Sequence, residues 1–259
     1  MLMLSIETIY TQINHIIWPT IRVLALFTSA PIFSEKSINK KTKIALAMCI
    51  SWLISQNLPE SRIAIFSLAG IGLAFQQIFF GVMMGLTVQL LFVAVRSAGE
   101  IMGMQMGLSF AMFFDPNGGQ NTPVISRILN LLVTLLFLTF DGHLWMISVL
   151  HESFVVLPVS VEQLNTQGAY YLAVQATFIF RCGLMLGLPV IALLLTINLT
   201  LGLLNRLTPQ LSIFVVGFPL TLTVGMMALL LKIYSLPPFF SNLMNEVFYH
   251  LSKILILSG

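Results

Sequence analysis

The residues of this chain that could carry chemistry are a few ionisable side chains set among long apolar stretches. Asp141 and His143 combine a carboxylate with an imidazole, the groups that form a proton relay inside a membrane. Residues two apart on a helix point in different directions, however, so the same pair also fits a kink or a hydrogen bond between helices. Arg96 and Glu100 are four residues apart and would pair along one helix face.

No sequence motif of a known catalytic or metal-binding type accompanies these residues. The sequence has no phosphate-binding loop, no zinc-protease motif, no cluster of cysteine and histidine, and no serine-nucleophile motif. Cys49 and Cys182 both lie inside apolar runs, where cysteine acts as a small packing residue. We therefore expect no enzymatic activity, no cofactor and no bound metal.

Charge is so scarce that the composition decides the class of protein. Of the 259 residues 58% are hydrophobic and 8% are charged, against about 25% charged in an ordinary soluble domain. The mean hydropathy is +0.97. Such a chain cannot cover a water-exposed surface with polar side chains. This excludes a soluble enzyme, a disordered linker and a nucleic-acid binder, and leaves lipid, apolar partner subunits or both as the surroundings.

The elements that must position these residues are apolar helices of irregular length. Residues 63–95 form a charge-free run that would be roughly 50 Å long as a helix, against ~30 Å of bilayer hydrocarbon. This run must tilt, extend beyond the bilayer or break, and Gly70–Gly72 is the place where we expect such a break. The shorter run 101–114 is either a re-entrant segment or a further crossing, and the distribution of charge between the loops favours the re-entrant segment. Further breaks are predicted at Asp141–His143 and at Lys232–Pro238, and the basic segment 36–43 is expected in the cytoplasm.

Small residues at helical spacing, together with flexible apolar side chains, precede a turn-rich loop. Gly99, Gly103 and Gly107 would let another helix approach closely, within the chain or between subunits. Methionines and phenylalanines between residues 102 and 114 fit either ordinary core filling or a deformable seal. The residues 115–123, which contain Asp-Pro, Asn-Gly and Gly-Gly pairs, end the helix. The pattern is compatible with a plug, but ordinary packing of these residues in the protein core would give the same pattern.

Three stretches resemble the FliR family, the export-gate subunits of the flagellar type III secretion system. They are Trp18–Leu26 with Ala30–Glu35, Val95–Phe110 with Phe114–Pro116, and Gly202–Phe214 with Gly217–Leu222. The stretch Phe137–Trp145 also fits, so that the similarity covers essentially the whole chain.

The resemblance implies an all-α membrane protein of long, broken and hairpin helices that acts without catalysis. Residues 1–168 would form a FliP-like region and residues 169–259 a FliQ-like helical hairpin with an amphipathic tail. With FliP and FliQ the chain would build a pore at the flagellar basal body, in the bacterial inner membrane, that exports unfolded flagellar proteins. It would also contact FlhB and membrane lipid. The alternatives are the equivalent subunit of a virulence injectisome and a stand-alone secondary transporter, whose substrate sites also contain broken helices and buried charges.

The resemblance also implies roles for individual residues. The loop at about 106–122 would plug the closed pore, and the charged residues at the edges of apolar runs would meet other subunits. The expected plug and pore residues are Met106, Phe110, Met112, Phe113, Phe114, Asp115, Pro116, Asn117, Gly118 and Gly119. The expected inter-subunit charge contacts are Arg22, Arg96, Glu100, Arg127, Asp141 and Arg206.

Overall fold

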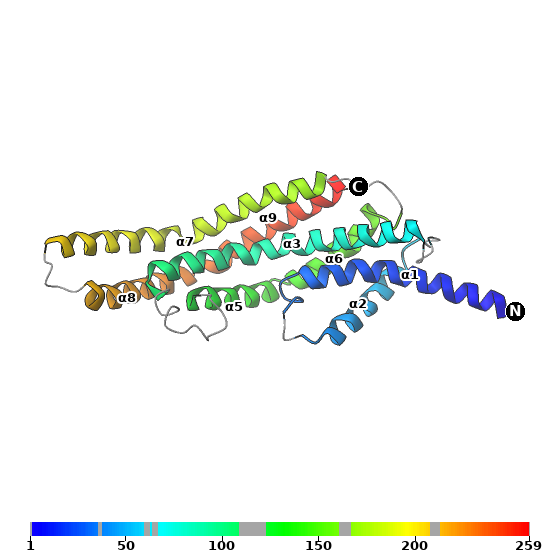
Figure 1. Ribbon diagram of the computed structural model, residues 1–259, viewed down its shortest axis with the longest axis horizontal. Coiled ribbons are helices and arrows are strands. Elements are labelled where there is room, and N and C mark those ends of the chain that lie inside the picture. Colours follow the sequence, from blue (N-terminus) through cyan, green and yellow to red (C-terminus); the bar gives the residue numbers. More distant parts are fainter. Residues whose placement is uncertain are drawn as a thin grey trace. The chain divides into compact units, whose positions relative to one another are not determined.

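The computed structural model describes residues 2–35, 38–59, 63, 67–108, 123–160, 167–207 and 213–258, and within these ranges every regular element is a helix (Figure 1). An all-α fold follows from the sequence because its apolar runs are longer than strands and contain few breakers. The helices are α1 (Leu2–Ser29), α2 (Lys40–Ser55), α3 (Leu68–Gln105), α5 (Val124–Thr139), α6 (Gly142–Val156), α7 (Gln167–Leu207), α8 (Ile213–Ile233) and α9 (Leu236–Ser258).

Helix α3 runs without interruption for 38 residues, which corrects one of our expectations. The predicted break at Gly70–Gly72 was wrong, because both glycines lie in the first turns of the helix. A helical glycine costs only about 1 kcal/mol relative to alanine, which apolar packing offsets. The first residues of the run 101–114 continue α3 as far as Gln105, residues 109–114 lie outside the described residues, and the re-entrant segment stays a prediction.

The two other predicted breaks agree with the structure. Helix α5 ends at Thr139 and α6 begins at Gly142, with Asp141 between them in the left-handed backbone region (φ 54°). Aspartate tolerates this conformation better than most residues because its short side chain bonds locally. Helices α8 and α9 are separated at Tyr234–Ser235 and bent by 62°.

The helix lengths and compositions are those of a membrane protein. Helices α3 and α7 are each long and apolar enough to cross a bilayer, and the described part of the chain offers up to four spans if α5 with α6 and α8 with α9 each count as one bent span. Large apolar side chains remain exposed on most helices, as expected where lipid or other subunits replace water.

The chain forms two compact units, and three helices contribute to both. Unit 1 comprises residues 1–90, 141–175 and 246–259, and unit 2 comprises residues 91–140 and 176–245. The core of unit 1 contains Trp18, Leu26, Phe27, Phe80 and Phe154, and the core of unit 2 contains Leu91, Val133, Phe137, Leu194 and Phe240. This division does not follow the predicted boundary at residue 168, and the FliP-like and FliQ-like regions stay a prediction.

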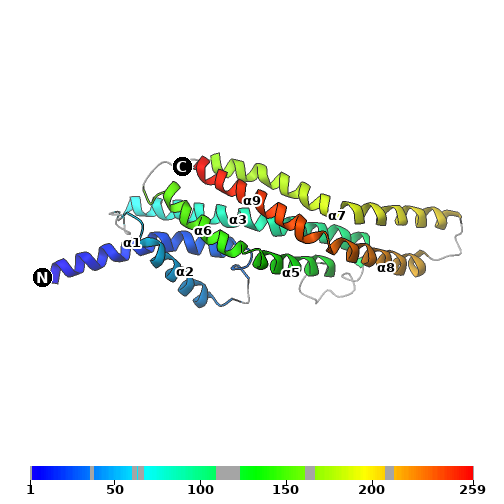
Figure 2. The ribbon, with the colours of Figure 1, turned by 180° about the vertical axis from the view of Figure 1, so that it is seen from behind.

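Within unit 1 the start of α7 lies beside the end of α9 (Figure 2). A Cβ on Gly168 would overlap the hydroxyl of Ser258. The Tyr171 hydroxyl and His250 Nδ1 are joined by a 2.9 Å hydrogen bond, and the Lys253 ammonium lies 5.1 Å from the centre of the Tyr171 ring. Polar contacts therefore join two segments that are far apart in the sequence.

Candidate functional site

The structure describes the first three residues of the predicted plug loop and the residue that follows its last one. The described chain stops at Leu108 and resumes at Pro123. The predicted plug residues Phe110, Met112, Phe113, Phe114, Asp115, Pro116, Asn117, Gly118 and Gly119 lie outside the described residues. Met106 is described, and it shows where the loop begins.

The loop begins where the end of α3 packs on α8. Met106 is completely buried, and its side chain fills the space beside Gly225, where an added Cβ would lie 2.7 Å from both Cγ and Cε of the methionine. The Thr221 hydroxyl lies 3.4 Å from the Met106 carbonyl oxygen, to which it donates a long hydrogen bond.

Gly107 ends the helix in a conformation that suits glycine. Its φ is +81°, and its N–H donates to the Met104 carbonyl oxygen at 3.0 Å. Left-handed residues of this kind commonly terminate helices because they satisfy a carbonyl that the next turn would otherwise bond. A Cβ at this position would also lie 3.0 Å from the Phe218 ring. Gly107 is therefore the helix-ending residue and does not extend the packing face of Gly99 and Gly103.

The loop returns to the same end of α3. Pro123 precedes the first residue of α5, and its Cβ lies 2.7 Å from the Cβ that a residue larger than glycine would have at position 103. One turn earlier, a Cβ on Gly99 would lie 2.6 Å from the Ser126 Cα. The two glycines thus let α5 approach the backbone of α3, and the described residues on either side of the segment 109–122 lie at one end of α3. We call Met106, Gly107, Pro123 and their contacts on α3 and α8 the loop base.

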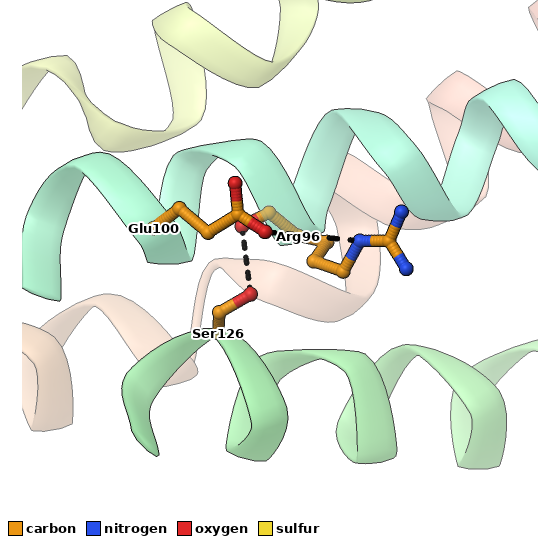
Figure 3. A network of polar contacts seen from close by, with 3 residues as sticks. All are labelled: Arg96, Glu100 and Ser126. Atoms are coloured by element: carbon orange, nitrogen blue, oxygen red, sulfur yellow. Dashed lines mark hydrogen bonds and ion pairs between the residues drawn. The ribbon is translucent and has the colours of Figure 1, made fainter. Parts of the chain in front are cut away.

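Polar contacts reinforce the α3–α5 contact next to the loop base (Figure 3). The Ser126 hydroxyl donates to the Arg96 carbonyl oxygen at 3.0 Å, and Arg96 Nε lies 3.9 Å from Glu100 Oε1. The side chains of the ion pair remain 44% and 38% exposed, so the pair is worth only a few tenths of a kcal/mol. The predicted pairing along one helix face is present, and both charges remain within reach of another chain.

Arg22 lies in a different environment from the one we expected. Its side chain is fully buried in unit 1, and neutral groups receive its hydrogen bonds. Nε donates to Gln77 Oε1 at 2.7 Å, Nη1 to the Ser153 carbonyl oxygen at 2.9 Å and Nη2 to the Leu157 carbonyl oxygen at 2.8 Å. The Phe154 ring lies 4.1 Å from the guanidinium carbon, a distance suited to a cation–π contact. We predicted a carboxylate from a neighbouring chain, but this geometry leaves no exposed surface on Arg22 for one.

The end of α6 explains why a buried arginine is stable without a carboxylate. Ser153 and Leu157 belong to the last turn and the C-cap of α6. The final carbonyl groups of a helix lack partners within the helix and carry the negative end of its dipole. Arg22 donates to the Leu157 carbonyl oxygen, adds a second hydrogen bond to the Ser153 carbonyl oxygen, which also accepts from the Leu157 N–H at 2.9 Å, and supplies the positive charge that such a helix end favours. The residue therefore ties α1 to α3 and α6.

The remaining predicted charge contacts lie at the surface of the chain. Arg127 is in the first turns of α5, Arg206 is in the last turn of α7, and Asp141 lies between α5 and α6; all three are exposed. The proton relay that we considered for Asp141 has no geometric support among the described residues. The Nδ1 atom of His143 is buried there without a hydrogen-bond partner.

Sequence reasoning missed the partners of Met106 and Arg22. Gln77 belongs to a Gln-Gln pair inside a charge-free apolar run, which is a signal for a buried polar contact. Gly225 in an apolar helix is a weaker signal. Among the described residues no group of three or more histidine, cysteine, aspartate or glutamate side chains could hold a metal ion.

Long apolar helices, close glycine contacts and scarce charge define a helical integral membrane protein, and comparison with known proteins identifies its family. The sequence model of the bacterial export proteins, family 1, matches residues 13–247. The chain is 54% identical over 243 residues to the flagellar biosynthetic protein FliR of Pectobacterium carotovorum subsp. carotovorum, covering 94% of this chain and 93% of that protein. It is 49% identical over 255 residues to FliR of Escherichia coli (strain K12), covering 98% of each. A more distant relative, FliR of Bacillus subtilis (strain 168), is 27% identical over 215 residues.

The chain therefore belongs to family 1 of the bacterial export proteins. It is a non-enzymatic component of the flagellar export apparatus in the bacterial inner membrane. The relatives named here are flagellar proteins, which favours this assignment over the injectisome subunit and the stand-alone transporter.

Proposed function

We propose that this chain forms, together with FliP and FliQ, the pore through which unfolded flagellar proteins are exported, and that residues 106–122 plug this pore when it is closed. In this proposal residues 1–168 are the FliP-like region, residues 169–259 are the FliQ-like hairpin, and FlhB binds the assembled gate. Membership of the export family supports the role in transport.

The observation that supports the plug most directly is the loop base. A plug must move relative to the pore wall while staying attached to it, which requires fixed ends and a deformable middle. Met106 is fully buried against Gly225, and Pro123 lies against Gly103, so the residues on either side of the segment 109–122 are packed against helices. The glycines and prolines at 116–119 and 123 suit the turns that such a loop needs.

Deleting residues 110–120 tests the plug. We expect cells that carry the deletion to leak ions through an export gate that still assembles, measured by membrane potential and by co-purification of the gate. A matched variant replaces the same residues by glycine and serine, which keeps the length but removes the apolar rings, and it should leak as well. Unchanged permeability together with lost assembly would show that the loop is a structural element and not a plug.

We further propose that Arg96, Glu100, Arg127, Asp141 and Arg206 contact charged groups of neighbouring subunits. Arg127→Glu and Arg206→Glu should each reduce co-purification with FliP, because like charges would then face each other. The double variant Arg96→Glu with Glu100→Arg keeps the pair within α3 but reverses its direction. Assembly should fail in this double variant if the charges face a partner, and normal assembly would restrict the pair to a role inside α3.

A further inference from the structure

The C-terminal end of α3 presents carbonyl groups that the helix itself does not bond. Gln105 is the final residue of α3, and Met106 follows it. The last four carbonyl groups of a helix have no N–H partner within the helix. Water usually takes the place of this partner, but a carbonyl group that packing shields from water is costly unless another group bonds it. Because Met106 is completely buried, its carbonyl group needs a partner from the protein.

Side chains of α7 and α8 supply the missing partners. Asn198 of α7 donates from Nδ2 to the Gln105 carbonyl oxygen at 3.3 Å. The Thr221 hydroxyl of α8 lies 3.4 Å from the Met106 carbonyl oxygen. Both donors come from charge-free apolar parts of their helices, where a polar side chain is costly unless it is hydrogen-bonded. Helices α7 and α8 therefore meet the end of α3 through specific hydrogen bonds as well as through apolar packing.

The Thr221 hydroxyl has more acceptors than it can serve. Its oxygen also lies 3.0 Å from the Gly217 carbonyl oxygen and 3.1 Å from the Phe218 carbonyl oxygen, both within α8. A hydroxyl group has one hydrogen atom to donate, so the three carbonyl groups compete for it. Exchanging one acceptor for another costs little, because the hydroxyl stays hydrogen-bonded in each arrangement. Thr221 therefore suits a contact with α3 that is released and formed again.

The direction in which the chain leaves α3 depends on this helix end. Gly107 has a φ of +81°, and its N–H donates to the Met104 carbonyl oxygen at 3.0 Å. An added Cβ on Gly107 would lie 3.0 Å from the Phe218 ring of α8. Holding the backbone at residues 105 and 106 thus fixes the position of the glycine at which the chain turns away from the helix axis.

We propose that Asn198 and Thr221 are positioning residues of the export gate. They hold residues 105–107 against α7 and α8, and transfer of the Thr221 hydroxyl to the carbonyl groups of α8 frees this end of α3. The consequence for permeability rests on the proposed plug, because residues 106–122 would keep the pore closed only while the first of them stay in place. The hydrogen bonds to α3 do not depend on that proposal.

Hydrogen exchange tests whether the two side chains hold α3. The chain is purified with the other subunits of its export apparatus, and exchange of the Met106 and Gly107 amide protons is followed by mass spectrometry. Thr221→Val keeps the shape of the side chain but removes the hydroxyl, and Asn198→Leu removes the amide donor. Loss of one hydrogen bond should raise the exchange rate by roughly two- to twelvefold. Thr221→Ser, which keeps the hydroxyl, should exchange like the unmodified protein.

Two exposed threonines on the same helices provide matched controls. The Thr223 hydroxyl donates only within α8, to the carbonyl oxygens of Pro219 and Leu220, and the Thr200 hydroxyl donates within α7. Thr223→Val and Thr200→Val should therefore leave the exchange at residues 106 and 107 unchanged. If Thr221→Val exchanges like Thr223→Val, or Asn198→Leu like Thr200→Val, the residue concerned does not hold α3 and the proposal fails for it.

Ion leakage in cells tests the role in the gate and separates it from the plug. We expect leakage from Thr221→Val and Asn198→Leu but not from Thr221→Ser, with co-purification of the gate unchanged in all three. Leakage after deletion of residues 110–120 but not in Thr221→Val or Asn198→Leu would overturn the positioning role and leave the plug standing. A deletion that does not leak, together with raised exchange in Thr221→Val, would contradict the plug and with it the role of the two residues in closing the pore.

Discussion

Replacing Gly99 by alanine tests whether the close contact of α3 with α5 holds the loop base together. A Cβ at this position would lie 2.6 Å from the Ser126 Cα and 3.0 Å from the Ser126 backbone nitrogen. Both are backbone atoms, so no side-chain rotation relieves the overlap, and α5 itself must move. Gly72 on the same helix has no atom within 4 Å of an added Cβ. Gly72→Ala is therefore a matched control.

The expected size of the effect follows from two opposing terms. Alanine stabilises a helix by about 1 kcal/mol relative to glycine, and Gly72→Ala should show this gain alone. Carbon atoms pack at about 3.5–4.0 Å, so Gly99→Ala requires a shift of about 1 Å, and overpacking of this kind costs about 1–3 kcal/mol. The two variants should then differ in stability by about 1–3 kcal/mol. At about 2–4 °C per kcal/mol, this gap corresponds to about 2–12 °C in melting temperature.

Thermal unfolding of the purified export gate in detergent, followed by tryptophan fluorescence, measures this gap. We expect Gly99→Ala to melt below Gly72→Ala, and ion leakage to increase in cells that carry Gly99→Ala, because the loop base is loosened. If Gly99→Ala melts at the same temperature as Gly72→Ala or above it, α5 does not approach α3 as described and our account of the loop base fails. A lowered melting temperature without leakage would support the close contact of α3 with α5 and contradict the proposal that residues 106–122 plug the pore.

Two further predictions concern buried side chains. Arg22→Lys should destabilise the protein by about 1–3 kcal/mol, because the shorter ammonium group leaves at least one of the acceptors on Gln77 and Leu157 unsatisfied and a buried unsatisfied group costs about 1–3 kcal/mol; a melting temperature equal to that of the unmodified protein would contradict the hydrogen bonds described for the guanidinium. Met106→Ala should cost about 2–5 kcal/mol by leaving a cavity beside Gly225, whereas Met106→Leu should cost less than about 1.5 kcal/mol. Equal denaturation midpoints for these two variants would contradict the packing described for Met106.

The sequence predicts the helices and several of their ends because those depend on neighbouring residues. The charge-free runs mark the long helices, and the polar residues at 141–143 and 232–238 mark two real interruptions. The failed break at Gly70–Gly72 shows the limit of the bilayer-length argument. A helix need not end where the hydrocarbon ends, and the cost of two glycines is small against the packing of a 38-residue helix.

The partners of the predicted site residues depend on contacts that are distant in the sequence. The spacing of Gly99 and Gly103 predicts a close helix contact, but only the structure identifies α5 as the helix involved. The charge of Arg22 suggests a carboxylate, because pairing opposite charges is the simplest way to bury a cation. The observed solution uses carbonyl groups at the end of α6, and no local pattern in the sequence reports where that helix end will lie.

The environment of Arg22 also restricts the order in which the chain can fold. The carbonyl groups that receive its hydrogen bonds belong to residues 131 and 135 positions later in the chain. At about 5–20 residues per second, a ribosome needs roughly 7–27 s to synthesise that interval. Throughout this time the guanidinium must remain in contact with water or headgroups, because an unpaired cation is too costly to bury. Helix α1 is synthesised before α6, but it can take its final place only after α6 has emerged.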